Sequence, residues 1–151
     1  IKLPGGPMIS DGSRVTKDFG RLNRYEVAQT GEKIAIIGLG TFFELAKEAA
    51  KLLKEEAGIN ATVINPYYIT GLDEALLTKL KQNHDTVITL EDGILDGGFG
   101  EKIARFYGAS NMKVMNYGLK KEFLDRYDVD AVLKENHLTA EQIAEDVLSI
   151  L

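Results

Sequence analysis

The sequence lacks cysteine and tryptophan, and only two of its 151 residues are histidine. The absence of cysteine excludes disulfide bonds, thiol nucleophiles and cysteine metal ligands, and it fits a cytoplasmic protein. The two histidines, far apart in sequence, give no metal-ligand spacing. A serine nucleophile is unsupported as well, because no Gly-x-Ser-x-Gly motif occurs. We therefore predict no catalytic residue and no metal site in this chain.

Basic clusters and long apolar runs are also scarce. The chain has 18 Lys and Arg against 23 Asp and Glu, a net charge of −5. Binding to a nucleic-acid backbone needs a clustered basic face, and short pairs such as Lys120-Lys121 are typical of solvated surface. The longest apolar runs, such as Ile34–Ile37, are far shorter than the roughly 20 residues of a membrane span. The composition thus predicts neither a nucleic-acid partner nor a membrane partner.

The first 20 residues differ from the rest. Residues 4–7 read Pro-Gly-Gly-Pro and residues 10–13 carry turn chemistry, a composition that commonly joins domains. We predict that residues 1–20 are a linker with the end of a missing upstream domain, whose last strand ends at residues 1–3. One domain would then occupy residues 21–151.

Strand patterns alternate with helix patterns along that domain. Strands are predicted over 24–29, 34–37, 61–65, 86–90 and 113–117, and helices over 41–57, 73–81, 101–107, 128–135 and 139–151. Such alternation is typical of βαβ units, whose right-handed crossovers place helices on both faces of a parallel sheet. We predict an α/β fold of three layers, α/β/α, with a mostly parallel five-stranded sheet and one antiparallel edge strand.

The helix ends carry their own signals. Thr41 with Glu44, and Thr139 with Gln142, match the capping box, in which the side chains at a helix start bind its first amides. Gly58 is the expected C-terminal stop of the first helix. His84 and His137 lie where helices end, so we interpret them as partners of the last helical carbonyls rather than as catalytic bases or metal ligands.

A first glycine motif, Gly38-x-Gly40, lies between a buried strand and a helix, where dinucleotide-binding folds hold a pyrophosphate. The third glycine of that fingerprint falls on Phe43, and the next strand ends in Asn65-Pro66 instead of an acidic residue. We interpret the motif as a tight turn. A small nucleotide-binding, Rossmann-like domain stays an alternative.

A second motif, Gly97-Gly98-x-Gly100, follows the acidic pair Glu91-Asp92. Its free N–H groups could hold an anion or admit another backbone, and a plain βα loop is the simpler interpretation. The two motifs follow adjacent strands, at the usual functional edge of this fold. Glu91, Gly97, Gly98 and Gly100 are therefore our interface or loop candidates.

The ordered motifs together resemble a known domain family. They are the segments 34–41, 61–65, 71–74, 84–85, 88–91 and 97–100, followed by Tyr117-Gly-Leu119. Their order is similar to that in the C-terminal domain of transketolase-like thiamine-diphosphate enzymes, and within that group to 1-deoxy-D-xylulose-5-phosphate synthase.

The resemblance implies a division of labour. In these enzymes thiamine diphosphate and Mg²⁺ lie between two upstream domains, while the C-terminal domain packs on them and helps to form a homodimer. The implied parent reaction is decarboxylation of pyruvate and carboligation with glyceraldehyde 3-phosphate, for isoprenoid precursors and thiamine. No cofactor site is expected in this chain, and the chain alone is expected to be inactive. The alternative within this fold is the C-terminal domain of a 2-oxoacid dehydrogenase β subunit, which docks an acyltransferase.

The sequence departs from the family at positions where the family has residues that help to hold the substrate phosphate. The family's Tyr-Pro-Arg-Gly, whose Arg helps to hold that phosphate, corresponds to Leu3-Pro-Gly-Gly6, so the Arg position is Gly5. Lys2 is a weak substitute nearby. A second family Arg, in Met-Arg-Phe, is lost at Pro66-Tyr-Tyr68, and the usual Pro-Asp after Gly-Leu is Lys120-Lys121. The resemblance thus implies that phosphate is bound by other domains or that the substrate differs.

Overall fold

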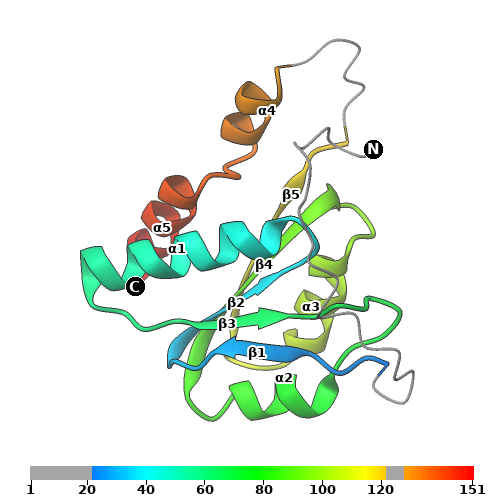
Figure 1. The fold of residues 1–151 in the computed structure, drawn as a ribbon. Helices are drawn as coiled ribbons and strands as arrows, with labels where there is room; N and C mark the ends of the chain where they lie inside the picture. The colour runs from blue at the N-terminus through cyan, green and yellow to red at the C-terminus, as the bar shows by residue number, and fades with distance from the viewer. Residues whose placement is uncertain (1–21, 122–127) are drawn as a thin grey trace.

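The computed structural model describes residues 22–121 and 128–151 (Figure 1). Its strands are β1 (Glu26–Gln29), β2 (Lys33–Gly38), β3 (Thr62–Asn65), β4 (His84–Ile94) and β5 (Lys113–Leu119). Its helices are α1 (Phe42–Ala57), α2 (Glu74–Leu80), α3 (Phe99–Tyr107), α4 (Val129–Glu135) and α5 (Ala140–Ser149). The predicted linker, with Lys2 and Gly5, lies outside the described residues.

The strands form one sheet in the order β1-β3-β2-β4-β5. β1 pairs antiparallel with β3, whereas β2 pairs parallel with β3 and β4, and β4 with β5. The predicted mostly parallel sheet with one antiparallel edge strand is therefore confirmed. The parallel strands all point their carboxyl ends to the same edge, where the two glycine motifs lie.

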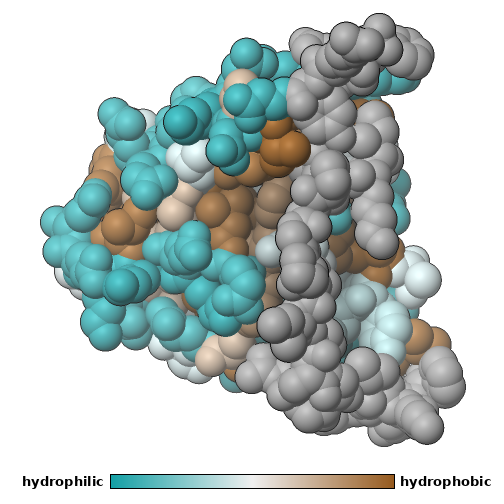
Figure 2. Space-filling view, turned by 45° about the horizontal axis from the view of Figure 1, so that its top comes forward, coloured by the Kyte–Doolittle hydropathy of each residue, from teal (hydrophilic) through white to brown (hydrophobic). Residues whose placement is uncertain are grey.

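Helices cover both faces of the sheet, as predicted. On one face, α1, α4 and α5 bury a core that includes Ile34, Ile36 and Ile88. On the other face, α2 and α3 bury a second core around Ala35, Ile37 and Val87. Neighbouring residues of β2 thus alternate between the two cores, which explains its unbroken apolar run. Figure 2 shows hydrophobic residues in a seam between hydrophilic borders on one side of the molecule.

Of the two predicted capping boxes and the predicted C-terminal stop, the box at Thr139 gives a cap and the stop at Gly58 is confirmed. Gly58 has a φ of +69°, and its N–H donates to the carbonyls of α1's last turn. The Thr139 hydroxyl accepts from the Gln142 N–H at 3.3 Å. The capping box at Thr41 is wrong, because Thr41 already has helical angles (φ −64°, ψ −26°) and makes no side-chain cap. The first amides of α1 donate instead to main-chain carbonyls of the preceding turn, residues 39 and 40.

Some predicted boundaries are also corrected. β4 does not end at Leu90 but continues through an irregularity to Ile94, so Glu91 belongs to the strand. α3 begins at Phe99, which places Gly98 at its N-cap and Gly100 inside its first turn. With these bounds, Glu91 near the end of β4 lies next to the start of α3. The contact between them is the centre of the candidate site.

Candidate functional site at the carboxyl edge of the sheet

The central group of this edge is the carboxylate of Glu91, which is only 3% exposed. Its Oε2 accepts from the Phe99 N–H at 2.8 Å, and its Oε1 accepts from the Gly100 N–H at 2.9 Å. Hydrogen bonds to a charged acceptor are stronger than neutral ones, and negative charge at a helix N-terminus is favoured by the helix dipole. Glu91 therefore caps α3 from the neighbouring strand.

The second glycine motif makes this cap sterically feasible. A Cβ on Gly98 would lie 2.6 Å from both oxygens of the Glu91 carboxylate, and a Cβ on Gly100 would lie 2.6 Å from the Thr89 hydroxyl oxygen. Gly97, with a φ of +73°, turns the chain, and its N–H donates to Glu101 at 2.9 Å. Two of the N–H groups that the sequence left open for an anion thus already bind a carboxylate of the same chain.

A hydrogen-bonded pair of side chains, buried Thr89 and half-buried Asn116, extends the polar strip under α3. The Thr89 hydroxyl donates to the Asn116 side-chain oxygen at 2.8 Å, which joins β4 to β5. Gly100 lies directly over this pair, since a Cβ there would also come within 2.7 Å of the Asn116 amide carbon. Thr89, Asn116 and Glu91 therefore form one layer on which the first turn of α3 rests. Asn116 was not among the candidates, because its contact with Gly100 depends on strand register.

The first glycine motif serves packing at the same edge. A Cβ on Gly38 would lie 2.7 Å from the Phe42 carbonyl oxygen and 2.8 Å from the Ala46 Cβ, so only glycine lets α1 approach β2 this closely. Gly40 has a φ of +59°, which glycine adopts without strain. These contacts support the tight-turn interpretation of Gly38-x-Gly40. They also place the turn beside β4, since a Cβ on Gly40 would lie 3.9 Å from the Asp92 carboxylate.

The two histidines lie away from this edge. His84 begins β4 at the opposite end of the sheet, where its Nδ1–H donates to the Leu80 carbonyl at 3.1 Å. The predicted contact with a last helical carbonyl is thus confirmed for His84. Its Nε2 lies 2.8 Å from the Thr62 hydroxyl, and burial lowers the pKa of the ring.

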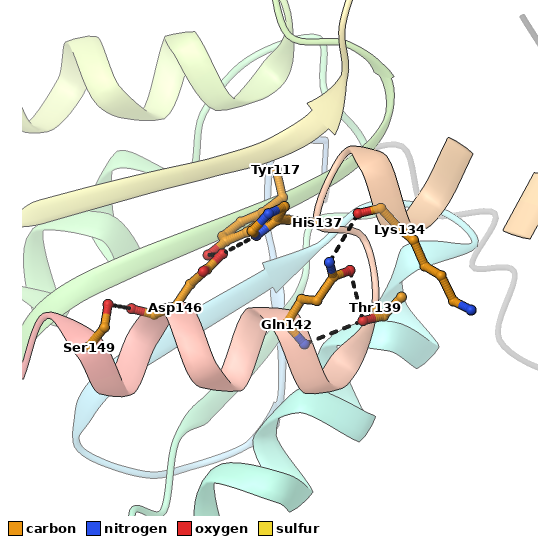
Figure 3. A network of polar contacts seen from close by, with 7 residues as sticks. All are labelled: Tyr117, Lys134, His137, Thr139, Gln142, Asp146 and Ser149. Atoms are coloured by element: carbon orange, nitrogen blue, oxygen red, sulfur yellow. Dashed lines mark hydrogen bonds and ion pairs between the residues drawn. The ribbon is translucent and has the colours of Figure 1, made fainter. Parts of the chain in front are cut away.

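His137 belongs to a second polar network, on the α5 side of the sheet (Figure 3). Its backbone N–H does reach a carbonyl of α4, but its Nδ1 lies 2.9 Å from the Asp146 carboxylate. The Tyr117 hydroxyl donates to the same carboxylate oxygen at 3.1 Å, and burial together with Asp146 raises the pKa of Tyr117. Sequence reasoning missed this network, which joins β5, α5 and the α4–α5 turn, because no local pattern links the three residues.

The described residues offer no fit for a resident cation. Among them, no three His, Asp or Glu side chains gather closely enough to hold a metal ion. The two most deeply buried carboxylates are engaged within the chain, Glu91 by α3 and Asp73 by the N–H groups of Tyr25 and Leu76. In the same part of the chain, no helix has the length and apolar character to cross a membrane.

Comparisons with known proteins agree on one family. The family model described as the transketolase C-terminal domain matches residues 23–143. Among curated proteins, 1-deoxy-D-xylulose-5-phosphate synthase of Symbiobacterium thermophilum is 37% identical over 132 residues, which cover 86% of this chain and 20% of that protein. The synthase of Francisella tularensis subsp. novicida is 30% identical and covers 97% of this chain and 23% of its own length. The chain thus spans about a fifth of the length of these relatives.

Solved structures give the same result. A split-gene transketolase, described as an inactive β4 tetramer, superposes with a TM-score of 0.73 at 27% identity, over 85% of this chain and 41% of that one. The transketolase of Campylobacter jejuni superposes with a TM-score of 0.61 at 18% identity, over 85% of this chain and 19% of that one, and shares the fold.

Proposed function

This chain belongs to the family of transketolase C-terminal domains, and we propose that it is the non-catalytic packing and dimerisation domain of a thiamine-diphosphate-dependent transferase. The synthase-like order of its motifs and its similarity to 1-deoxy-D-xylulose-5-phosphate synthases favour that enzyme as the parent. The parent would then decarboxylate pyruvate and join the product to glyceraldehyde 3-phosphate in the cytoplasm, for isoprenoid precursors and thiamine.

The non-catalytic role is supported by the hydrogen bonding of the polar groups at the carboxyl edge of the sheet. Ligands of open α/β sheets bind at this edge, usually on the free amides of a helix N-terminus. In this domain Glu91 binds two of those amides, and Thr89 and Asn116 bind each other. Because the central polar groups of this edge already bind one another, they are not free to bind a ligand. This favours a role in which the edge shapes a neighbouring active site. Thiamine diphosphate and Mg²⁺ would accordingly be held by upstream domains, as the resemblance implies.

The test has two parts. The chain alone, supplied with thiamine diphosphate and Mg²⁺, should not turn over pyruvate with glyceraldehyde 3-phosphate, and measurable turnover would contradict a non-catalytic domain. In a hybrid enzyme, residues 22–151 replace the matched region of the Symbiobacterium thermophilum synthase. The hybrid should turn over both substrates and sediment as a dimer. A folded hybrid without activity would contradict the assignment to this parent.

A further inference from the structure

Exposed hydrophobic side chains are concentrated on one side of the domain. Of the five large hydrophobic residues that are exposed in the described chain, four lie in or beside β1 and the loop that follows β3: Leu22 (46% exposed), Val27 (39%), Tyr67 (43%) and Ile69 (41%). The fifth, Leu151, is at the other end of the chain. We call the four residues, together with the outward edge of β1, the β1 edge surface. Clustered exposed apolar residues commonly mark interaction sites.

Hydrogen bonds hold the two segments of this surface together. The Asn23 side-chain oxygen accepts from the Thr70 hydroxyl at 2.8 Å. The Tyr25 N–H donates to the buried Asp73 carboxylate at 3.0 Å, and the Arg24 guanidinium lies 3.3 Å from the same side chain. The segment that leads into β1 is therefore fixed on the β3–α2 loop, and the two form a continuous surface.

β1 adds unpaired backbone to the apolar side chains. Among the described residues it lies at the end of the sheet order, so only one of its edges is paired there, with β3, and Glu26 through Gln29 are all exposed. Tyr67 lies across its start, with the hydroxyl hydrogen-bonded to the Glu26 carboxylate. A free strand edge beside apolar residues can bind another segment through main-chain hydrogen bonds and burial together.

We propose that the β1 edge surface packs against the domain that precedes this one in the same polypeptide. The inference rests on the proposed function as the C-terminal domain of a longer enzyme. The matched relatives extend well beyond the matched region, which is 20% of one synthase, and the family model begins at residue 23. The rest of such a polypeptide therefore reaches this domain at Leu22, within the surface itself.

Covalent attachment favours the preceding domain over a separate protein in solution as the partner of the β1 edge surface. If residues 1–20 are the linker that the sequence predicts, a Gly-rich chain of that length would hold a preceding domain on the order of 25 Å from Leu22. Attachment at that range gives an effective concentration on the order of millimolar, so a modest apolar surface suffices for stable packing. Interfaces between domains of one chain typically bury only about 600–1,500 Å².

Cysteine labelling in the hybrid enzyme tests the proposal, because this chain has no cysteine of its own. Ile69→Cys and, as the matched control, Leu151→Cys are compared in the free chain and in the hybrid, with the modified peptides read by mass spectrometry. We expect the labelling rate at Ile69→Cys to be about tenfold or more slower in the hybrid, because a covered site reacts only after local opening. The labelling rate at Leu151→Cys should change by less than about twofold. Equal labelling of Ile69→Cys in both proteins would overturn the proposal.

Amide exchange of β1 gives a second reading that needs no substitution. Residues 26–29 should exchange more slowly in the hybrid than in the free chain. If they are protected in the free chain in a concentration-dependent way, a second copy is the occupant and the proposal is wrong. An inactive hybrid with a protected β1 edge would contradict the proposed parent but support the docking surface, so the two failures are distinguishable.

Discussion

Replacing Glu91 tests whether the cap on α3 stabilises the carboxyl edge as the geometry indicates. Glu91→Ala leaves the Phe99 and Gly100 N–H groups without their acceptor at a site where Glu91 is 3% exposed. Each hydrogen bond to a charged group contributes about 1.5–3 kcal/mol. Relief of the cost of burying a carboxylate offsets part of that loss, so we expect a net loss of about 3 kcal/mol.

Glu91→Gln should fall between the wild type and Glu91→Ala. The amide keeps one acceptor oxygen but presents an NH₂ group to the other N–H donor, so we expect a loss of about 2 kcal/mol. Urea unfolding of the free chain measures both losses. The corresponding decreases in Tm are about 6–12 °C for the alanine variant and 4–8 °C for the glutamine variant, at 2–4 °C per kcal/mol for a domain of this size.

The neighbouring Asp92 provides the control. It is exposed and adjacent in sequence, so Asp92→Ala should change stability by less than about 0.5 kcal/mol. Faster amide exchange at Phe99 and Gly100 in the Glu91 variants, but not in Asp92→Ala, would locate the effect in α3. If Glu91→Ala were as stable as Asp92→Ala, or Glu91→Gln as stable as the wild type, the assigned role of the carboxylate would be wrong.

Three further substitutions test other parts of the same structure. Gly100→Ala places a Cβ 2.6 Å from the Thr89 hydroxyl oxygen, so it should lower the free energy of unfolding by about 2 kcal/mol in urea. The Thr86 hydroxyl is buried and has no hydrogen-bond partner among the described residues, so Thr86→Val should raise that free energy by about 1 kcal/mol, and a loss instead would show that the hydroxyl is bound. Burial lowers the pKa of His84 below 6.5, so below that pH the unfolded chain binds a proton that the folded chain resists. Wild-type stability should therefore fall as pH decreases from 6.5 towards the folded-state pKa; His84→Gln should remove this part of the pH dependence, and identical pH profiles would contradict the assignment.

The sequence predicted those parts of the fold that depend on local pattern. The β2 run and the glycine at Gly58 each contain their own signal, because a buried strand needs apolar residues on both faces and a helix end needs a left-handed residue. Thr41 shows the limit of this reasoning. A similar Thr-x-x-Glu/Gln pattern gives a side-chain cap at Thr139 but none at Thr41, where the first amides of α1 donate to main-chain carbonyls of the turn at Gly40.

The candidate site was only partly predictable, for a different reason. Glu91 and the glycines of the second motif were recognised, but a free helix N-terminus and one filled by a nearby carboxylate have the same sequence signature. The tertiary structure, with β4 continuing past Leu90, places the Glu91 oxygens 2.8 Å and 2.9 Å from the α3 amides. The network of Tyr117, His137 and Asp146 left no signal at all, because each residue lies on a different segment of the chain.

The two surfaces of the domain imply a direction of assembly. At the carboxyl edge the central polar groups of Glu91, Thr89 and Asn116 are paired within the domain, so this edge can keep its shape without a partner. At the β1 edge surface, hydrophobic side chains and strand backbone of the described residues are exposed to solvent. Burying these apolar side chains against a partner would therefore stabilise an assembly. If the β1 edge surface docks as we propose, the domain would fold before it docks. The carboxyl edge should therefore have the same structure in the free chain as in the assembled enzyme, and protection on assembly should include the β1 side.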